Sequence, residues 1–427
     1  MNEAFLSRGT GPARRATRPA LTLLAFMMSV GPFGDTEYTP AMPAIARSLD
    51  TSYGMVQFTM ASYLIGSALS RLAYGPLSDR FGRRPVMLVG ALILVAGTLL
   101  CLLSFSIWPL IAGRLVQGVG ACAGGVLSDA AVRDAFPADK REGIYARLNA
   151  AFALAPAVGP VVGVYAASKL GWHGNFGLLL ALSVLLLVLV WRYLPETLAR
   201  SNRQSLGARH VGSNYLQVIR SRGFLLYSVL GGLSVGVVYT ALIGAPDLVY
   251  NVLKGGDVGI MIVSAAILVA FVTGAGLCEL VSDKITDLWI FTAGLAVMAM
   301  GGAALLVVAV LIGKEANFAF LLAPIAFCFI GVGLIVPATT ANAMAPFKDN
   351  AGTASSMLGF VQTGTAALAT AGMSAISQGS IIDMPIVFLA LTLTAFLLLA
   401  GYVVKSGGIA ATIAAFPTPQ GRHSRSS

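Results

Sequence analysis

Hydrophobic runs of about 20 residues alternate with short polar segments along most of the chain. They lie near residues 20–43, 54–76, 86–106, 108–130, 144–168, 175–194, 224–249, 258–281, 287–312, 317–345, 351–378 and 384–404. As a helix, each run is long enough to cross a hydrocarbon core of about 30 Å. The strands of a membrane β-barrel would instead alternate in polarity over about ten residues. The pattern predicts an all-α membrane protein with twelve transmembrane helices.

The longest polar stretch between the hydrophobic runs, residues 195–223, divides the chain into two halves. We expect an N-tail (1–19), a six-helix bundle (20–194), a central loop (195–223), a second six-helix bundle (224–404) and a C-tail (405–427). A short repeat supports this division, because Ser78–Asp79 and Ser282–Asp283 both follow the second run of their half. Transporters built from two such bundles bind their substrate in a central cavity between them.

The charged residues indicate how the chain sits in the bilayer. Only 11% of the residues are charged and 57% are hydrophobic, with a net charge of +10. If the N-terminus is cytoplasmic, 22 of the 28 Lys and Arg fall on cytoplasmic segments or at the cytoplasmic ends of the runs, as the positive-inside rule requires. We therefore expect both termini in the cytoplasm. The positive charge reflects topology and not a nucleic-acid partner, and the first run is too long and too polar at its centre for a cleavable signal.

The sequence gives no indication of an enzyme, a metal site or a cofactor. The four cysteines have unrelated spacings, which argues against a disulfide framework or a metal site. "GLSVG" (232–236) has the spacing of a hydrolase nucleophile, but the three histidines lie in predicted loops or the C-tail, so we interpret it as helix packing. There is no G-x-x-x-x-G-K-[ST] motif for ATP, so a proton gradient is the expected source of energy.

Three charged residues lie inside predicted membrane spans at similar depth. Asp35 and Glu37 are in the first span, and Arg114 is in the fourth. Such residues usually face a cavity or a partner of opposite charge. A titratable carboxylate near a permanent cation is suited to proton coupling, because protonation changes the charge of the site and lets protons compete with substrate. A purely structural role for Arg114 is the alternative.

Asp35 and Glu37 cannot point in the same direction on a regular helix, because two residues correspond to a rotation of about 200°. Pro40 removes the hydrogen bond to the carbonyl of Thr36, so a bend is expected between the two acids. The face around Asp35 carries more polar residues than the face around Glu37. On that ground Asp35 is the favoured cavity-facing carboxylate.

Several motifs resemble the major facilitator superfamily, and in particular its Bcr/CflA-type drug-resistance branch. They are "GPLSDRFGRRP" (75–85), "GRLVQGVGA" (113–121), "AVRDAFP" (131–137), "ALAPAVGPVVG" (153–163), "LPETL" (194–198) and "GVGLIVPATTANAMAPFKDNAGTASSMLGFVQ" (331–362). The resemblance implies the major facilitator fold, with two six-helix bundles around a central cavity. It also implies exchange of protons for an exported substrate.

The resemblance also assigns roles to individual residues. Asp79, with Arg80, Arg83 and Arg84 beside it, would help to latch the two bundles together on the cytoplasmic side. Pro156, Gly159, Pro160 and Gly163 would form the antiporter motif, a bent and closely packed helix between the halves. From helix position, we expect Tyr38, Gln117, Asn149 and Tyr239 to contribute to the substrate cavity.

The chain departs from the family pattern at two positions. The family usually has an acid four residues before Pro40, where this chain has Thr36, flanked by Asp35 and Glu37. Arg71 stands where the family usually has Gln, and its side chain is expected to extend toward the cytoplasm. Glu279 is either a second titratable group or an interfacial charge.

The sequence thus predicts a proton-coupled exporter of amphipathic drugs, such as phenicol-like antibiotics, in the inner membrane. We expect it to work as a monomer by alternating access. The alternative within transport is an exporter of an endogenous metabolite or sugar. An intramembrane aspartyl protease would need one acid on each of two helices, whereas both acids lie on one predicted span here. A sensor of this fold would ordinarily carry an added soluble domain.

Overall fold

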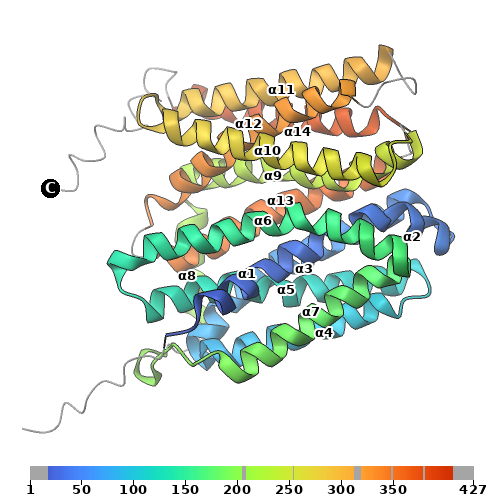
Figure 1. Cartoon of the computed structure of the whole chain (residues 1–427). Helices are drawn as coiled ribbons and strands as arrows, with labels where there is room; N and C mark the ends of the chain where they lie inside the picture. Colours follow the sequence, from blue (N-terminus) through green and yellow to red (C-terminus); the bar gives the residue numbers. More distant parts are fainter. Residues whose placement is uncertain are drawn as a thin grey trace, which may run out of the picture.

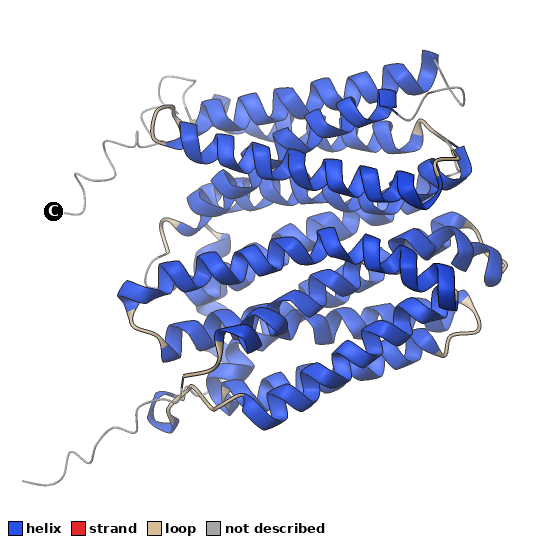
Figure 2. Ribbon diagram, viewed as in Figure 1, coloured by secondary structure: helices blue, strands red, loops and turns tan. Residues whose placement is uncertain are grey.

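The computed structural model describes residues 18–203, 208–252, 254–311, 319–347, 350–377 and 380–406. Within these ranges the chain is helical and contains no strand (Figure 2). Most of the two predicted tails, residues 1–17 and 407–427, and part of the predicted central loop, residues 204–207, lie outside the described residues.

The N-terminal half contributes helices α1 to α7. They are α1 (Leu21–Thr36), α2 (Met42–Ser48), α3 (Tyr53–Phe81), α4 (Arg83–Leu102), α5 (Ile107–Ala135), α6 (Ala138–Leu170) and α7 (Trp172–Tyr193), with the 3₁₀ turn η1 (Thr39–Ala41) between α1 and α2. The connection to the second half contains the 3₁₀ turn η2 (Arg200–Asn202) and α8 (Ala208–Ile219).

The C-terminal half contributes helices α9 to α14. They are α9 (Arg222–Asp247), α10 (Gly256–Ser282), α11 (Asp287–Leu311), α12 (Ala319–Met344), α13 (Ala351–Ile376) and α14 (Asp383–Lys405), with a π-helical turn, η3 (Leu248–Val252), after α9. Figure 1 shows the two halves side by side, the first in blue to green and the second in yellow to red.

A helix occupies each of the twelve predicted spans, and the all-α membrane fold is confirmed. In the described ranges, nine helices are long and apolar enough to cross a membrane. The three that fall short are α1, which has 16 residues, and α3 and α13, which carry more polar and small residues. The count of twelve spans therefore stays a prediction.

The two halves use the same pattern of helix contacts. In the first half the second and third spans (α3 and α4) pack on the fourth (α5), and the first (α1) packs on the fifth (α6). In the second half α10 and α11 pack on α12, and α9 packs on α13 in the same way. The halves meet where the second span of each contacts the fifth span of the other: α3 lies on α13, and α10 lies on α6. The short repeat in the sequence therefore belongs to a structural repeat.

Glycines bring the backbones of these helix pairs into direct contact. A Cβ atom at Gly118 of α5 would lie 2.0 Å from the carbonyl oxygen of Tyr63 on α3. In the second half, a Cβ atom at Gly274 of α10 would lie 2.2 Å from the carbonyl oxygen of Ile330 on α12. Small residues of this kind let membrane helices gain van der Waals contact where lipid offers no hydrophobic driving force.

Helix α8 in the central connection was not predicted from the sequence. The hydroxyl of Tyr215 donates to the carbonyl oxygen of Leu72 on α3 (3.1 Å), while Val218 is buried against Phe224 and Met357 of the second half. Burial raises the pKa of Tyr215, so its hydroxyl stays protonated as a donor. The apolar spacing of Val211, Tyr215, Val218 and Ile219 in the sequence was the available signal. Helix α8 thus connects the two halves at one end of the protein.

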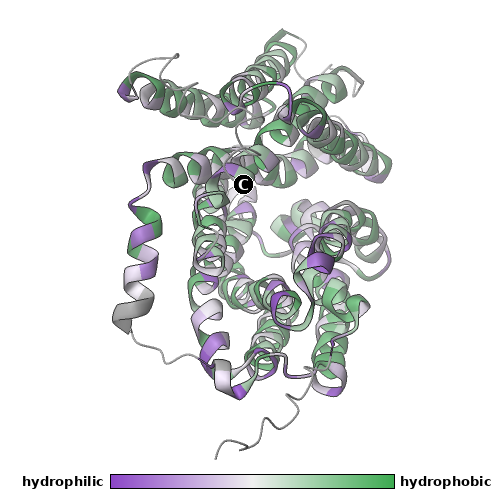
Figure 3. Cartoon of the chain, turned by 90° about the vertical axis from the view of Figure 1, so that its left-hand side faces the viewer, coloured by the Kyte–Doolittle hydropathy of each residue, from purple (hydrophilic) through white to green (hydrophobic). Residues whose placement is uncertain are grey.

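Figure 3 looks along the helices from that end, and shows α8 at the edge of a largely hydrophobic set of helices. We call this the basic end. It carries the start of α4 and α9 and the ends of α3 and α5, with Arg83, Arg84, Arg133, Arg141 and Arg222. The opposite end carries α2 and the start of α14.

We predict that Gly118→Ala lowers the thermal stability of the purified protein. The added methyl group would meet only backbone atoms of α3, so the helices must separate, at a cost of about 1–3 kcal/mol. The control is Gly143→Ala on α6, where nothing lies within 4 Å and alanine favours the helix by about 1 kcal/mol. Thermal unfolding in detergent measures both variants. Equal melting temperatures for the two would contradict this account of the α3–α5 contact.

Candidate substrate and proton site

The first helix, α1, ends between Asp35 and Glu37, the two acids predicted from the sequence to act in proton coupling. Helix α1 stops at Thr36, and the chain continues through a turn that contains Pro40. Because Pro40 has no N–H for the carbonyl of Thr36, the hydroxyl of Thr39 donates to that oxygen instead, at 2.8 Å. The predicted break is confirmed, and it places Asp35 in the last turn of α1 and Glu37 just beyond it.

Asp35 lies at the contact between the two halves. The hydroxyl of Tyr239, on α9, donates to Oδ2 of Asp35 at 2.9 Å. The Asp35 residue is 7% exposed, and its Oδ1 atom has no hydrogen-bond partner among the described residues. This hydrogen bond joins a titratable group of the first half to a helix of the second half.

Glu37 lies inside the first half. Its residue is 0% exposed, and neither carboxylate oxygen has a hydrogen-bond partner in the part of the chain that the structure describes. Its carbonyl oxygen accepts a hydrogen bond from Nδ2 of Asn175 on α7, at 2.7 Å. The two acids therefore face different neighbours, as expected from their spacing in the sequence.

Arg114 is held between two tyrosine rings. Its guanidinium carbon lies 4.1 Å from the ring centre of Tyr38 and 4.4 Å from that of Tyr63. Stacking of this kind stabilises a desolvated cation by about 2 kcal/mol. The guanidinium also donates to the carbonyl oxygen of Gly34 (3.1 Å) and to the side-chain oxygen of Gln117.

Arg114 does not form a direct ion pair with either acid. It interacts electrostatically with Asp35 and with Glu37, but no oxygen of either carboxylate lies within 4 Å of its nitrogens in the described structure. It is attached instead to α1 through Gly34, one residue before Asp35. The positive charge thus lies beside the break in α1 and is fixed there by neutral groups.

Two of the predicted cavity residues surround Arg114 inside the first half. Gln117 is fully buried, and its Nε2 donates to the hydroxyl of Thr98 at 2.9 Å. Tyr38 is fully buried, with its hydroxyl 3.0 Å from that of Thr59. Their predicted place in the substrate cavity stays a prediction. Their position makes them supports for Arg114 in this conformation.

The antiporter motif packs directly on the break in α1. A Cβ atom at Gly159 would lie 2.1 Å from Oγ1 of Thr36, and one at Gly163 would lie 1.7 Å from the carbonyl oxygen of Glu37. Pro156 and Pro160 stand in the same helix, α6, which continues unbroken from Ala138 to Leu170. The small residues of this motif therefore leave room for the turn that separates the two acids.

A cavity of about 510 Å³ lies between the two halves at the basic end. Asn149 of α6 lines it, together with Met28 of α1 and Ser355 and Ser356 of α13. Met28 precedes Asp35 by seven residues, which is about two helical turns, so the two side chains leave α1 on nearly the same side. Asp35 therefore lies about 10 Å further along α1 than Met28, which lines the cavity.

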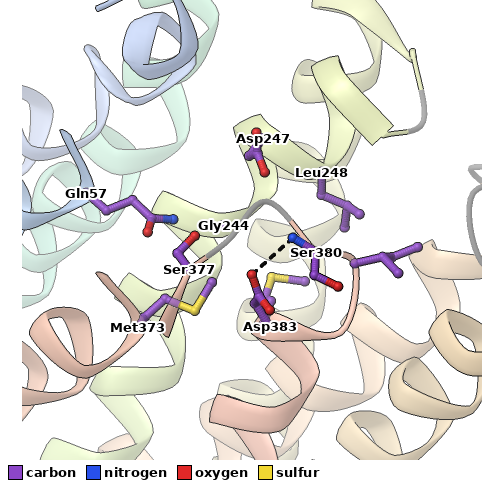
Figure 4. A pocket seen from close by; sticks show the side chains of 10 residues that line it. Gln57, Gly244, Asp247, Leu248, Met373, Ser377, Ser380 and Asp383 are labelled. Carbon is purple, nitrogen blue, oxygen red and sulfur yellow. Dashed lines mark hydrogen bonds between the residues drawn. The ribbon is translucent and has the colours of Figure 1, made fainter. Parts of the chain in front are cut away.

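The opposite end of the protein is tightly closed. The side chains of Tyr53 and Gln57, on α3, donate to the carbonyl oxygen of Ile243 on α9 at 2.8 and 3.0 Å. Figure 4 shows the small pocket next to this contact, which holds only about 10 Å³. At its edge the N–H of Ser380 donates to Oδ2 of Asp383 at 3.1 Å. The cavity of about 510 Å³ thus lies at the basic end, while α3 and α9 are in direct contact at the opposite end.

The predicted latch residues bind within the first half. Arg83 pairs with Asp79 (2.6 Å) and with Asp134 of α5 (2.8 Å), and its N–H donates to Oε1 of Glu196 at 2.9 Å. Gly82, between α3 and α4, has a φ of +103°, and a side chain there would also collide with Glu196. The contacts of Asp134 and Glu196 were missed from the sequence, although both residues lie in recognised motifs.

The other two latch arginines also contact their own half. Nη2 of Arg84 donates to the carbonyl oxygen of Trp191 on α7 at 2.6 Å, and Arg80 lies over the ring of Phe81. A latch between the two halves stays a prediction for these four residues. Glu279 is exposed on α10 near its end.

A family model agrees with this architecture. The model described as "Major Facilitator Superfamily" matches residues 21–371. The solved D-xylose-proton symporter has the same fold, with a TM-score of 0.70 at 17% identity, covering 88% of this chain and 96% of that one. A POT family transporter in complex with 5-aminolevulinic acid aligns with a TM-score of 0.72 at 12% identity, covering 90% and 95%.

Curated relatives with similar sequences are resistance proteins. Multidrug resistance protein D of Escherichia coli is 29% identical over 84% of this chain and 90% of that protein. The bicyclomycin resistance protein homolog of Haemophilus influenzae is 28% identical over 83% and 88%, and the chloramphenicol resistance protein of Pseudomonas aeruginosa is 29% identical over 78% and 79%. These relatives are consistent with the Bcr/CflA-type branch. The chain belongs to the Major Facilitator Superfamily, and it is a multi-pass membrane transporter and not an enzyme.

Proposed function

We propose that this transporter exports small amphipathic drugs, including phenicol-like antibiotics, across the inner membrane in exchange for protons. The relatives named as multidrug, bicyclomycin and chloramphenicol resistance proteins support drug export. The basic end would face the cytoplasm, in keeping with the positive-inside rule. No cofactor is needed in this proposal, because the proton gradient supplies the energy.

The observation that carries the proposal is the hydrogen bond between Asp35 and Tyr239. It joins a titratable carboxyl group to the opposite half, about two helical turns along α1 from the cavity residue Met28. Protonation of Asp35 removes its charge while Arg114, held by its tyrosine rings, keeps its own. The net charge next to the cavity therefore depends on the proton, and substrate and proton can compete for the site.

Alternating access follows from the asymmetry between the two ends. In the conformation described, α3 and α9 hold the opposite end closed through the carbonyl oxygen of Ile243. Export requires these contacts to open while the halves approach each other at the basic end. The hydrogen bond from Tyr239 to Asp35 lies between those two regions, so a change in the protonation of Asp35 acts where the halves move against each other.

We predict that Asp35→Asn reduces proton-driven uptake of chloramphenicol into inverted membrane vesicles by about tenfold or more. The amide keeps the shape of the side chain but cannot bind and release a proton. Glu37→Gln is the matched comparison, because Glu37 is fully buried and its backbone carbonyl is bound by Asn175 of the first half. We expect it to retain most of the uptake. Uptake that survives Asp35→Asn and is lost in Glu37→Gln would overturn the assignment of Asp35.

A second prediction concerns which end of the protein faces the cytoplasm. Asn149 lines the cavity near the start of α6, Lys169 is exposed near the other end of that helix, and the four native cysteines are buried. A membrane-impermeant maleimide should therefore label Asn149→Cys in inverted vesicles and Lys169→Cys in spheroplasts. The reverse pattern would place the basic end outside the cytoplasm.

A further inference from the structure

Arg71 of α3 points across the gap between the two halves. A methyl group at Gly359 of α13 would lie 2.6 Å from Nη1 of Arg71, so the guanidinium lies against the opposite bundle at a glycine. Its Nε atom is buried without a hydrogen-bond partner among the described residues, and the side chain lines the cavity. An arginine inside a membrane protein normally pairs with a nearby carboxylate, whereas Arg71 forms no close ion pair in the described ranges.

A second guanidinium lies against the same face of α13. Arg133 of α5 is exposed, lines the same cavity, and would lie 3.3 Å from a methyl group at Gly352. Gly352 and Gly359 are seven residues apart, which is two turns and about 10 Å along one side of α13. In the described ranges neither Arg71 nor Arg133 has a carboxylate oxygen within 4 Å.

The charges of the cavity wall do not balance. Arg141 also lines it, and its guanidinium donates to the carbonyl oxygens of Phe136 and Arg133, which leaves its charge in place. The carboxylate of the wall is Asp129 of α5, which interacts with Arg71 and Arg133 electrostatically without a close ion pair. Asp35, further along α1, also interacts electrostatically with Arg71. Three guanidinium groups of the wall thus face two carboxylates, together with the neutral donors of Tyr145, Asn149 and Ser355.

We propose that this cavity binds the anionic group of an amphipathic organic anion, with Arg71 and Arg133 as its charge partners. A carboxylate in the cavity accepts charge-assisted hydrogen bonds from one planar guanidinium group, and the second guanidinium adds electrostatic attraction. The apolar part of the ligand extends along Met28 and Phe152. The partly desolvated setting strengthens that attraction relative to water. The inference rests on the proposed function and adds the substrate class: drugs with a carboxylate are bound more tightly than their neutral esters.

The test is equilibrium binding by calorimetry to the full-length protein in phosphatidylcholine nanodiscs. The probes are chloramphenicol hemisuccinate, which carries a carboxylate, and its methyl ester, which is neutral and of similar size. The wild-type protein should bind the hemisuccinate about tenfold more tightly than the ester. Arg71→Gln should remove that preference and leave the affinity for the ester within about twofold, whereas Arg71→Lys should keep part of it.

Two further variants complete the design. Arg133→Gln changes an exposed side chain, so it reports on the site even if Arg71→Gln does not fold, and it should also reduce the preference. Arg192→Gln, on the exposed surface of α7, changes the net charge equally and should leave the preference intact.

The outcomes separate this inference from the proposed function. Equal affinity of the wild-type protein for hemisuccinate and ester, or an equal loss for both in Arg71→Gln and Arg133→Gln, would refute the anion site. If the anion site is refuted but the ester is still bound and chloramphenicol is still exported, the proposed drug export stands without an anion site. If neither compound is bound and chloramphenicol is not exported, both proposals fail.

Discussion

The break in α1 after Thr36 is the constraint on which the rest of the site depends. Pro40 cannot donate to Thr36, so the helix ends one residue after Asp35, and the hydroxyl of Thr39 takes the free carbonyl. Because of the break, the Asp35 side chain contacts the second half, whereas Glu37 is buried in the first half. The break also requires the glycines of α6, because any side chain at Gly163 would overlap the backbone at Glu37. The antiporter motif on α6 and the acidic pair on α1 therefore pack directly against each other.

Arg114 adds a permanent charge to this arrangement without neutralising either acid. Its guanidinium contacts two aromatic rings, a carbonyl and an amide, all on the first half. The charge is thus held within the first half, while the partner of Asp35, Tyr239, belongs to the second half. A charge that stays and a proton that leaves are what the proposed exchange of protons for substrate requires.

The sequence predicted the fold and the break well, because both depend on local patterns. The hydrophobic runs predict the helices. Pro40 and the two-residue spacing of Asp35 and Glu37 predict that the two carboxylates point in different directions. The contacts of buried polar residues were harder to predict from the sequence. Gln117 and Tyr38 lie on polar stripes, but a stripe does not distinguish a cavity from the interior of a bundle, and here both pack around Arg114. Helix α8 had a local apolar pattern that the prediction did not use. The contacts of α8 and the positions of Arg71 and Asp129 depend on packing between the halves, which no local pattern records.

The most direct test of the central claim is to measure the protons released when substrate binds. Purified protein in weakly buffered detergent solution is mixed with a saturating concentration of chloramphenicol, and a pH indicator follows the solution. If substrate and proton compete at Asp35, the wild-type protein releases protons on binding and the Asp35→Asn variant, which still binds, releases none. Equal proton release from the two proteins would contradict the claim that Asp35 is the coupled group.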